Sequence, residues 1–158
     1  MPPPLLFDLA GVDHSVVCLS RDQIYTLLPH RHEFMVLSGV CHLNQESLHI
    51  LAFSDIAAGD WWCRGHVPDR SILPGVLMLE MGAQTSAVLA KLTGRYDAFI
   101  GYGGVDQCKF REAVFPPARL YLLSVGLEHR PRRIVSAVQG VIDDRIIFEA
   151  TVTGLVMP

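Results

Sequence analysis

The longest apolar stretch of the chain runs from Val76 to Leu92, in a sequence whose other apolar runs are shorter and mixed with polar residues. Its ionisable side chains are Glu80 and Lys91 alone, so no wide polar face is left. A helix that is apolar on nearly all sides is buried in a protein core. Such a helix would be about 25 Å long, and the carboxyl group in its second turn argues against a membrane span. We therefore predict the central helix of a soluble domain.

Ahead of this helix, the pattern predicts one short helix and two strands. Ser20–Gln23 has the pattern of a capping box, and the apolar spacing after it predicts a helix that stops before Pro29. The β-branched and alternating stretches at residues 35–43 and 47–54 predict two strands, joined by a turn at residues 44–45.

After the central helix, which Thr93–Gly94 is expected to end, the pattern changes to alternating strands. We predict four of them, at about residues 98–110, 119–129, 133–142 and 145–156, with Asp143–Asp144 as a hairpin turn. One long helix followed by consecutive antiparallel strands indicates an α+β domain, in which an antiparallel sheet wraps around the central helix.

Composition limits the domain organisation. Half of the 158 residues are hydrophobic and 18% are charged, which suits one domain with a sizeable core. We expect residues 1–20 to form an arm that lies on the domain or on a partner, and residues 21–158 to form the domain. No basic region precedes an apolar run at the start, so we expect no signal peptide.

Charge and cysteines exclude several classes of protein. A formal net charge of −3, without a basic stripe, gives no case for nucleic-acid binding. The four cysteines are widely spaced, and we interpret them as reduced thiols of a cytoplasmic protein. His30 and His32 lie close together, yet no histidine pair has helical spacing with a third ligand nearby, so we expect no metal. We expect His30–Arg31 to fix its loop by hydrogen bonds.

Three groups suited to catalysis lie around the start of the central helix. His66 carries an imidazole, the side chain that most often acts as a general base in enzymes. Apolar neighbours should desolvate Glu80, which favours the protonated acid and makes it a proton donor. The backbone N–H groups after Pro74–Gly75 lack intrahelical partners and carry the positive end of the helix dipole, so they can hold a developing oxyanion.

These residues resemble the signature of the 3-hydroxyacyl-(acyl-carrier-protein) dehydratases of fatty-acid synthesis, which have the hotdog fold. The likeness covers about residues 24–156 and rests on Gly65-His66-x-Pro68, Leu73-Pro74-Gly75-Val76-Leu77, Glu80 and Ala83-Gln84, with Leu28-Pro29-His30-Arg31-x-x-Phe34 upstream and Lys109-Phe110-Arg111 downstream.

The resemblance implies a role for each site residue. His66 and Glu80 would be catalytic, and Gly75, Val76 and Gln84 would bind the substrate and its oxyanion. No metal or cofactor is implied. The partner would be an acyl-carrier protein with a phosphopantetheine-linked acyl chain. The assembly would be a homodimer, or a trimer of dimers, that joins the histidine of one subunit to the acid of the other.

Differences from the family pattern refine this expectation. Glu80 in place of aspartate, and Gly65 in place of cysteine, resemble the branch that dehydrates without moving the double bond. Ser38 lies where a charged pair is usual, Ser71 replaces a proline and Pro117–Ala118 replaces a Gly-Asp turn. These changes bear on substrate preference and oligomer contacts, because none of them touches the catalytic positions.

Several alternatives stay open. With an ionised Glu80 in a wetter pocket, the same fold could be a thioesterase, and without catalysis it could be an acyl-binding subunit. Trp61–Trp62 could line an acyl pocket, or at least one of the rings could belong to the core. A cationic set could be solvated surface or could in part contact an acidic carrier protein; it comprises Lys109, Arg111, Arg119, Arg130, Arg132 and Arg133.

Overall fold

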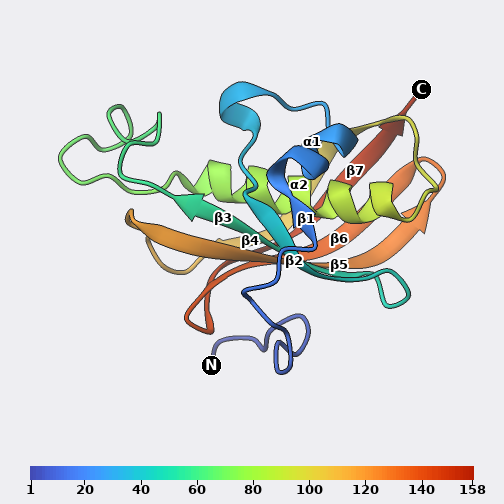
Figure 1. Cartoon of the computed structure of the whole chain (residues 1–158), viewed down its shortest axis with the longest axis horizontal. Helices are drawn as coiled ribbons and strands as arrows, with labels where there is room; N and C mark the ends of the chain where they lie inside the picture. The colour runs from blue at the N-terminus through green and yellow to red at the C-terminus, as the bar shows by residue number, and fades with distance from the viewer.

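Helix α2 (Gly75–Leu92) crosses one face of a seven-stranded antiparallel sheet that curves around it (Figure 1). The computed structural model describes residues 1–158. The other elements are β1 (Leu19–Ser20), α1 (Arg21–Leu27), a 3₁₀ turn (His32–Phe34), β2 (Gly39–Asn44), β3 (His49–Ile56), β4 (Phe99–Phe110), β5 (Ala118–Arg130), β6 (Arg133–Ile142) and β7 (Arg145–Met157). The strand order is β1-β2-β3-β5-β6-β7-β4, which leaves β1 and β4 at the two edges. This confirms the predicted α+β arrangement.

Local signals account for where several elements begin and end. Ser20 caps α1: its hydroxyl accepts from Gln23 N at 3.2 Å, and its own N–H donates to Gln23 Oε1 at 2.9 Å. Asp143 and Asp144 have φ angles of 49° and 59°, as a type I′ hairpin turn between β6 and β7 requires. Gly94, which follows the end of α2, has a φ angle of 73°, the left-handed conformation that commonly ends a helix.

The core lies between α2 and the sheet. Leu77, Met81, Val88 and Leu89 of α2 are buried against apolar side chains of the strands. Gly82 lets the helix approach the sheet closely, because a Cβ there would lie only 3.1 Å from Val138. Burial of the helix is therefore confirmed, with the exception of Val76 in the first turn, whose side chain is exposed.

The first two long strands differ from the prediction by a few residues. β2 begins at Gly39 and not at 35, because the backbone N–H of Leu37 donates to Tyr25 Oη and not to the neighbouring strand. The N–H of Ser38, directly before β2, already donates to Phe53 O of β3. The turn occupies residues 45–48, so β3 starts at His49.

The N-terminal segment covers the face of the sheet opposite α2, as the blue chain below the sheet in Figure 1 shows. Leu6 N donates to Gln139 Oε1 at 2.9 Å, and Gln139 Nε2 donates to Pro4 O at 3.1 Å. Phe7 stacks on His49 with ring centroids 4.6 Å apart. We call residues 1–18 the arm, because Leu19–Ser20 already belongs to the sheet as β1. None of the helices has the length and apolar character that crossing a membrane requires.

Candidate active site

His66 lies in the long connection between β3 and α2, and its ring orientation is fixed by backbone. The backbone N–H of His66 donates to Trp62 O at 2.8 Å, and the ring atom Nδ1 lies 2.8 Å from Ile72 O. A carbonyl oxygen can only accept, so neutral His66 carries its proton on Nδ1. Nε2 is then left with a free lone pair on an exposed ring, which is the form that a general base needs.

The start of α2 lies beside this imidazole. Pro74 provides no side-chain cap, and its carbonyl accepts from Leu77 N and Met78 N at 3.0 and 3.3 Å. The N–H groups of Gly75 and Val76 have no backbone partner, and the Val76 side chain is 71% exposed. Two free donors at the positive end of a helix can bind an oxyanion.

A cleft of about 600 Å³ contains both features, and we call it the His66 cleft. It is lined by His66, Ile72, Leu73, Pro74, Gly75, Val76, Met78 and residues 110–113. A Cβ at Gly75 would lie 3.0 Å from the Phe110 ring, so this position has little room for a side chain.

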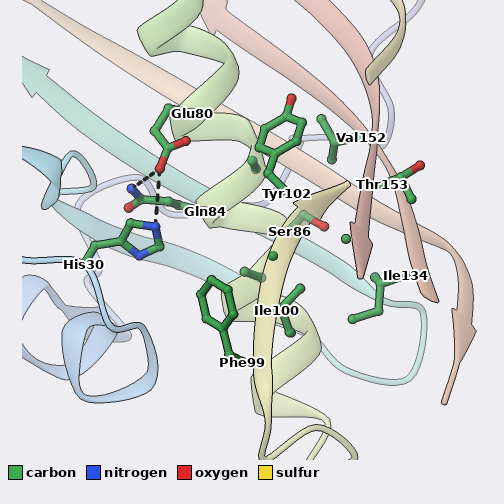
Figure 2. Close-up of a pocket in the computed structure, with 14 residues that line it drawn as sticks. His30, Glu80, Gln84, Ser86, Phe99, Ile100, Tyr102, Ile134, Val152 and Thr153 are labelled. Atoms are coloured by element: carbon green, nitrogen blue, oxygen red, sulfur yellow. Dashed lines mark hydrogen bonds and ion pairs between the residues drawn. The ribbon is translucent and has the colours of Figure 1, made fainter. Parts of the chain in front are cut away.

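Glu80 lies one turn further along α2, in a different cleft (Figure 2). Gln84 Nε2 donates to Glu80 Oε1 at 2.8 Å, and His30 Nε2 lies 3.3 Å from the same oxygen. We call this the Glu80 cleft, of about 200 Å³; it runs from His30 and Glu80 along Ala83 and Ala87 of α2, between α2 and strands β4, β6 and β7.

The expectation that burial keeps Glu80 protonated is wrong for this chain. The hydrogen bond with His30 is the largest effect and lowers the pKa of Glu80 below its ordinary value of 4.5. Burial acts in the opposite direction, and the hydrogen bond from Gln84 adds to the lowering. His30 comes from a loop 50 positions earlier, so the apolar neighbours of Glu80 in sequence did not indicate this contact.

The predicted site residues thus fall into two groups. His66, Gly75 and Val76 line the His66 cleft, whereas Glu80 and Gln84 line the Glu80 cleft, and the two clefts have no lining residue in common. Within one chain, the predicted base His66 and the predicted acid Glu80 therefore line separate clefts.

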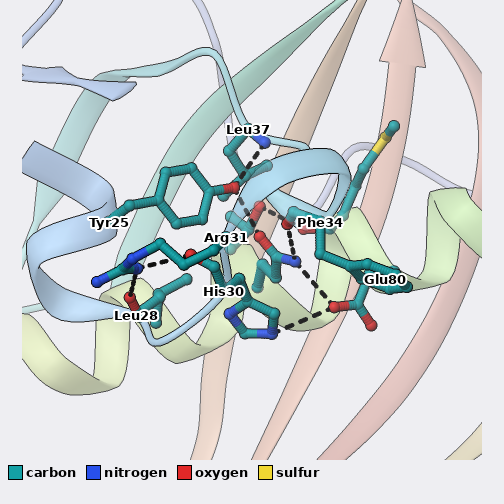
Figure 3. A network of polar contacts seen from close by, with 10 residues as sticks. Tyr25, Leu28, His30, Arg31, Phe34, Leu37 and Glu80 are labelled. Carbon is teal, nitrogen blue, oxygen red and sulfur yellow. Dashed lines mark hydrogen bonds and ion pairs between the residues drawn. The ribbon is translucent and has the colours of Figure 1, made fainter. Parts of the chain in front are cut away.

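Some neighbouring residues have roles other than those expected. Arg31 fixes its loop by donating to Leu28 O and His30 O at 3.0 and 2.6 Å, but the His30 ring points to Glu80 (Figure 3). Trp62 belongs to the core, Trp61 is half-exposed, and neither ring lines either cleft.

Two positions that depart from the family pattern tie loops to neighbouring backbone. Ser38 Oγ accepts from Asp55 N at 2.9 Å, and Ser71 Oγ donates to Cys63 O at 3.3 Å. No group of three or more His, Cys, Asp or Glu side chains in the chain is arranged to hold a metal ion.

Sequence comparison finds related proteins over most of the chain. The profile of the FabA-like domain matches residues 28–151. The 3-hydroxyacyl-(acyl-carrier-protein) dehydratase FabZ of Protochlamydia amoebophila is 31% identical over 134 residues, which are 85% of this chain and 87% of the relative. FabZ of Erwinia tasmaniensis is 32% identical and covers 84% of this chain and 89% of its own.

Solved structures with the same fold have much lower identity. A chain of the dehydratase heterocomplex ApeI:P from Xenorhabdus doucetiae superposes with a TM-score of 0.74 at 16% identity, covering 89% of this chain and 92% of that chain. A hypothetical thioesterase with coenzyme A from Streptococcus pneumoniae TIGR4 has a TM-score of 0.59 at 10% identity, covering 84% and 89%. These likenesses show the fold alone.

Proposed function

Because the chain belongs to the FabA-like family, together with the FabZ dehydratases, we propose that it is a 3-hydroxyacyl-(acyl-carrier-protein) dehydratase of fatty-acid synthesis. As a lyase it removes water from the 3-hydroxyacyl thioester and leaves the trans-2-enoyl thioester.

The observation that carries the chemistry is the His66 cleft. An α-proton next to a thioester is too weakly acidic for imidazole unless the enolate oxygen is stabilised. Here His66, whose Nε2 has no partner, lines the same cleft as Gly75 and Val76, whose N–H groups are unbonded. A thioester whose oxygen accepts from these two donors would present its α-carbon to the imidazole.

The reaction then needs a proton for the leaving hydroxyl. His66 Nε2 takes the α-proton, the C–H electron pair becomes the new double bond, and the C3–O bond breaks as Glu80 gives its proton to the departing oxygen. His66 gains one proton and Glu80 loses one, so proton exchange with solvent restores both. Because His30 lowers the pKa of Glu80, the acid must take up its proton in the substrate complex, where the bound acyl chain displaces water and favours the neutral form.

We propose that the two clefts meet across a homodimer. β4 is a free edge strand, and it exposes Phe99, Tyr102, Val105 and Phe110. Its start lines the Glu80 cleft and its end lines the His66 cleft. Antiparallel pairing of two β4 strands about a two-fold axis near Val105 would bring the start of one to the end of the other. Such a dimer has two sites, each with His66 of one subunit and Glu80 of the other; a trimer of dimers would repeat this unit.

The acyl-carrier protein is the proposed carrier of the substrate. Four members of the cationic set already pair with carboxylates of this chain: Arg111 with Glu149, Arg119 with Asp55, and Arg130 and Arg133 with Glu128. Lys109 and Arg132 have no such pair, so they are the members available to an acidic carrier.

The test is a panel of thioesters, each supplied on acyl-carrier protein and on coenzyme A. We expect the purified protein to interconvert 3-hydroxyacyl and trans-2-enoyl thioesters, to leave the saturated thioester intact and to form no 3-enoyl product. Hydrolysis of the saturated thioester, or binding without turnover of any thioester, would contradict the dehydratase proposal.

One observation favours thioester hydrolysis as a second candidate. A hydrolase would use an ionised Glu80 to activate water or to attack the thioester, and the lowered pKa of Glu80 suits that role. The same panel separates the two reactions, because only a hydrolase releases free thiol.

A further inference from the structure

A buried tyrosine on α1 is joined to Glu80 through one glutamine (Figure 3). Tyr25 is 4% exposed, and its hydroxyl lies 2.9 Å from Leu37 N and 2.7 Å from Gln84 Oε1. An amide N–H can only donate, so Tyr25 Oη accepts from Leu37. Its single proton therefore goes to Gln84 Oε1.

This contact decides which way the Gln84 amide faces. Gln84 is 2% exposed, and its Oε1 faces the tyrosine. Its NH₂ group then faces two acceptors, Phe34 O at 2.9 Å and Glu80 Oε1 at 2.8 Å. A flipped amide would set its oxygen against both acceptors and leave these two partly buried oxygens without their donor.

The same chain of contacts orients the carboxylate. Gln84 and His30 both meet Oε1 of Glu80, which leaves Oε2 without a partner in this chain. Oε2 is thus the oxygen available to a substrate hydroxyl in the Glu80 cleft. Phe34 and Leu37 belong to the segment that follows His30, so Gln84 of α2 and Tyr25 together hold that segment in place, one at each residue.

We propose that Tyr25 is a positioning residue for the reaction: by fixing the Gln84 amide, it aims Oε2 of Glu80 at the leaving hydroxyl. This inference rests on the proposed dehydratase function. Burial raises the pKa of Tyr25 to about 12, so the phenol remains a donor throughout the range in which the enzyme would work.

The test compares two buried tyrosines in the full chain. Tyr25→Phe removes the donor to Gln84. Tyr96→Phe is the matched control, because Tyr96 is 5% exposed and donates one hydrogen bond, to Arg130 O at 3.0 Å, outside both clefts. We expect Tyr25→Phe to lower kcat about tenfold to a hundredfold with KM changed less than about twofold, and Tyr96→Phe to leave both unchanged.

Two readouts separate positioning from a loss of stability. Exchange of the substrate α-proton with solvent depends on His66 and should continue in Tyr25→Phe while dehydration falls. The high-pH limb of the pH–rate profile should also shift to higher pH, because a misaligned Gln84 no longer helps to lower the pKa of Glu80. The other titratable groups that face Glu80 are His30 from the loop after α1 and Tyr102 from β4, and neither is changed.

Gln84→Met tests the same connection independently of Tyr25, since it keeps the side-chain length and removes the amide. It should reproduce the fall in kcat at constant KM, whereas a direct substrate-binding role of Gln84 would raise KM. Normal kcat in Gln84→Met or in folded Tyr25→Phe, or equal losses in Tyr25→Phe and Tyr96→Phe, would overturn the inference. A wild-type protein without dehydratase activity would instead overturn the proposed function, and the inference with it.

Discussion

Mixing two inactive variants should restore activity if each site is shared between subunits. His66→Ala lacks the proposed base and Glu80→Gln lacks the proposed acid, so a dimer of either variant alone would have no complete site. When the two chains unfold and refold together, random pairing makes about half of the dimers mixed. A mixed dimer has one site with both residues intact and one site with neither.

The expected recovery of activity follows from counting the intact sites in the mixture. One intact site in two, in half of the dimers, gives about a quarter of the wild-type activity when the sites act independently. The structure supports this arrangement because His66 and Glu80 open onto clefts without a common lining residue, at opposite ends of the edge strand β4.

The assay is dehydration of a 3-hydroxyacyl thioester by the refolded mixture, with each variant refolded alone as a control. Different affinity tags on the two chains allow the mixed dimer to be purified by two successive captures. A mixed dimer isolated in this way that has no activity would refute the shared site, because no pairing can repair a site built from one chain.

Three further predictions concern single residues. Gly75→Ala should lower kcat about tenfold with little change in Tm, because the new Cβ would meet the Phe110 ring at 3.0 Å and shift the oxyanion donors; an unchanged kcat would contradict that role. His30 lowers the pKa of Glu80, so this contact stabilises the fold above pH 4.5 and is lost as acid protonates Glu80. The Tm of His30→Ala should therefore fall less steeply than the wild-type Tm as the pH is lowered. Parallel plots of Tm against pH would argue against the pair. Val105→Lys should give a monomer in sedimentation and abolish activity, since two lysines would face each other at the proposed two-fold axis; an intact, active dimer would place the interface elsewhere.

Much of the fold could be predicted from local signals. The long strands after α2 alternate clearly, and the Asp143–Asp144 pair between them can take the positive φ angles of a tight hairpin. The capping box at Ser20 is complete within four residues, so the start of α1 was predictable as well. Bulges and loop contacts were not predictable in this way: β2 shifts register between Val40 and His42, and no sequence pattern indicates this.

The candidate site was predictable where its residues are close in sequence. His66, Gly75 and Glu80 surround one helix start, and the structure adds the Nδ1 contact that sets the tautomer of the histidine. The charge of Glu80 was not predictable, because the partner that lowers its pKa comes from a loop far away in the chain. Tyr25 is 59 positions from Gln84, so its role becomes visible only when α1 is packed against α2.

The arm on the outer face of the sheet has a consequence for the order of folding. Its bonds to Gln139 join residues 133 and 135 positions apart, so this contact closes one of the longest loops in the chain. Long-range contacts form late because loop closure has to be complete before they stabilise anything. We therefore expect the arm, although it precedes every strand in the sequence, to dock among the last segments, after β6 has joined the sheet. Without the docked arm, Leu51, Phe53 and Leu123 would be open to water, so we expect chains that lack this contact to be the most prone to aggregation.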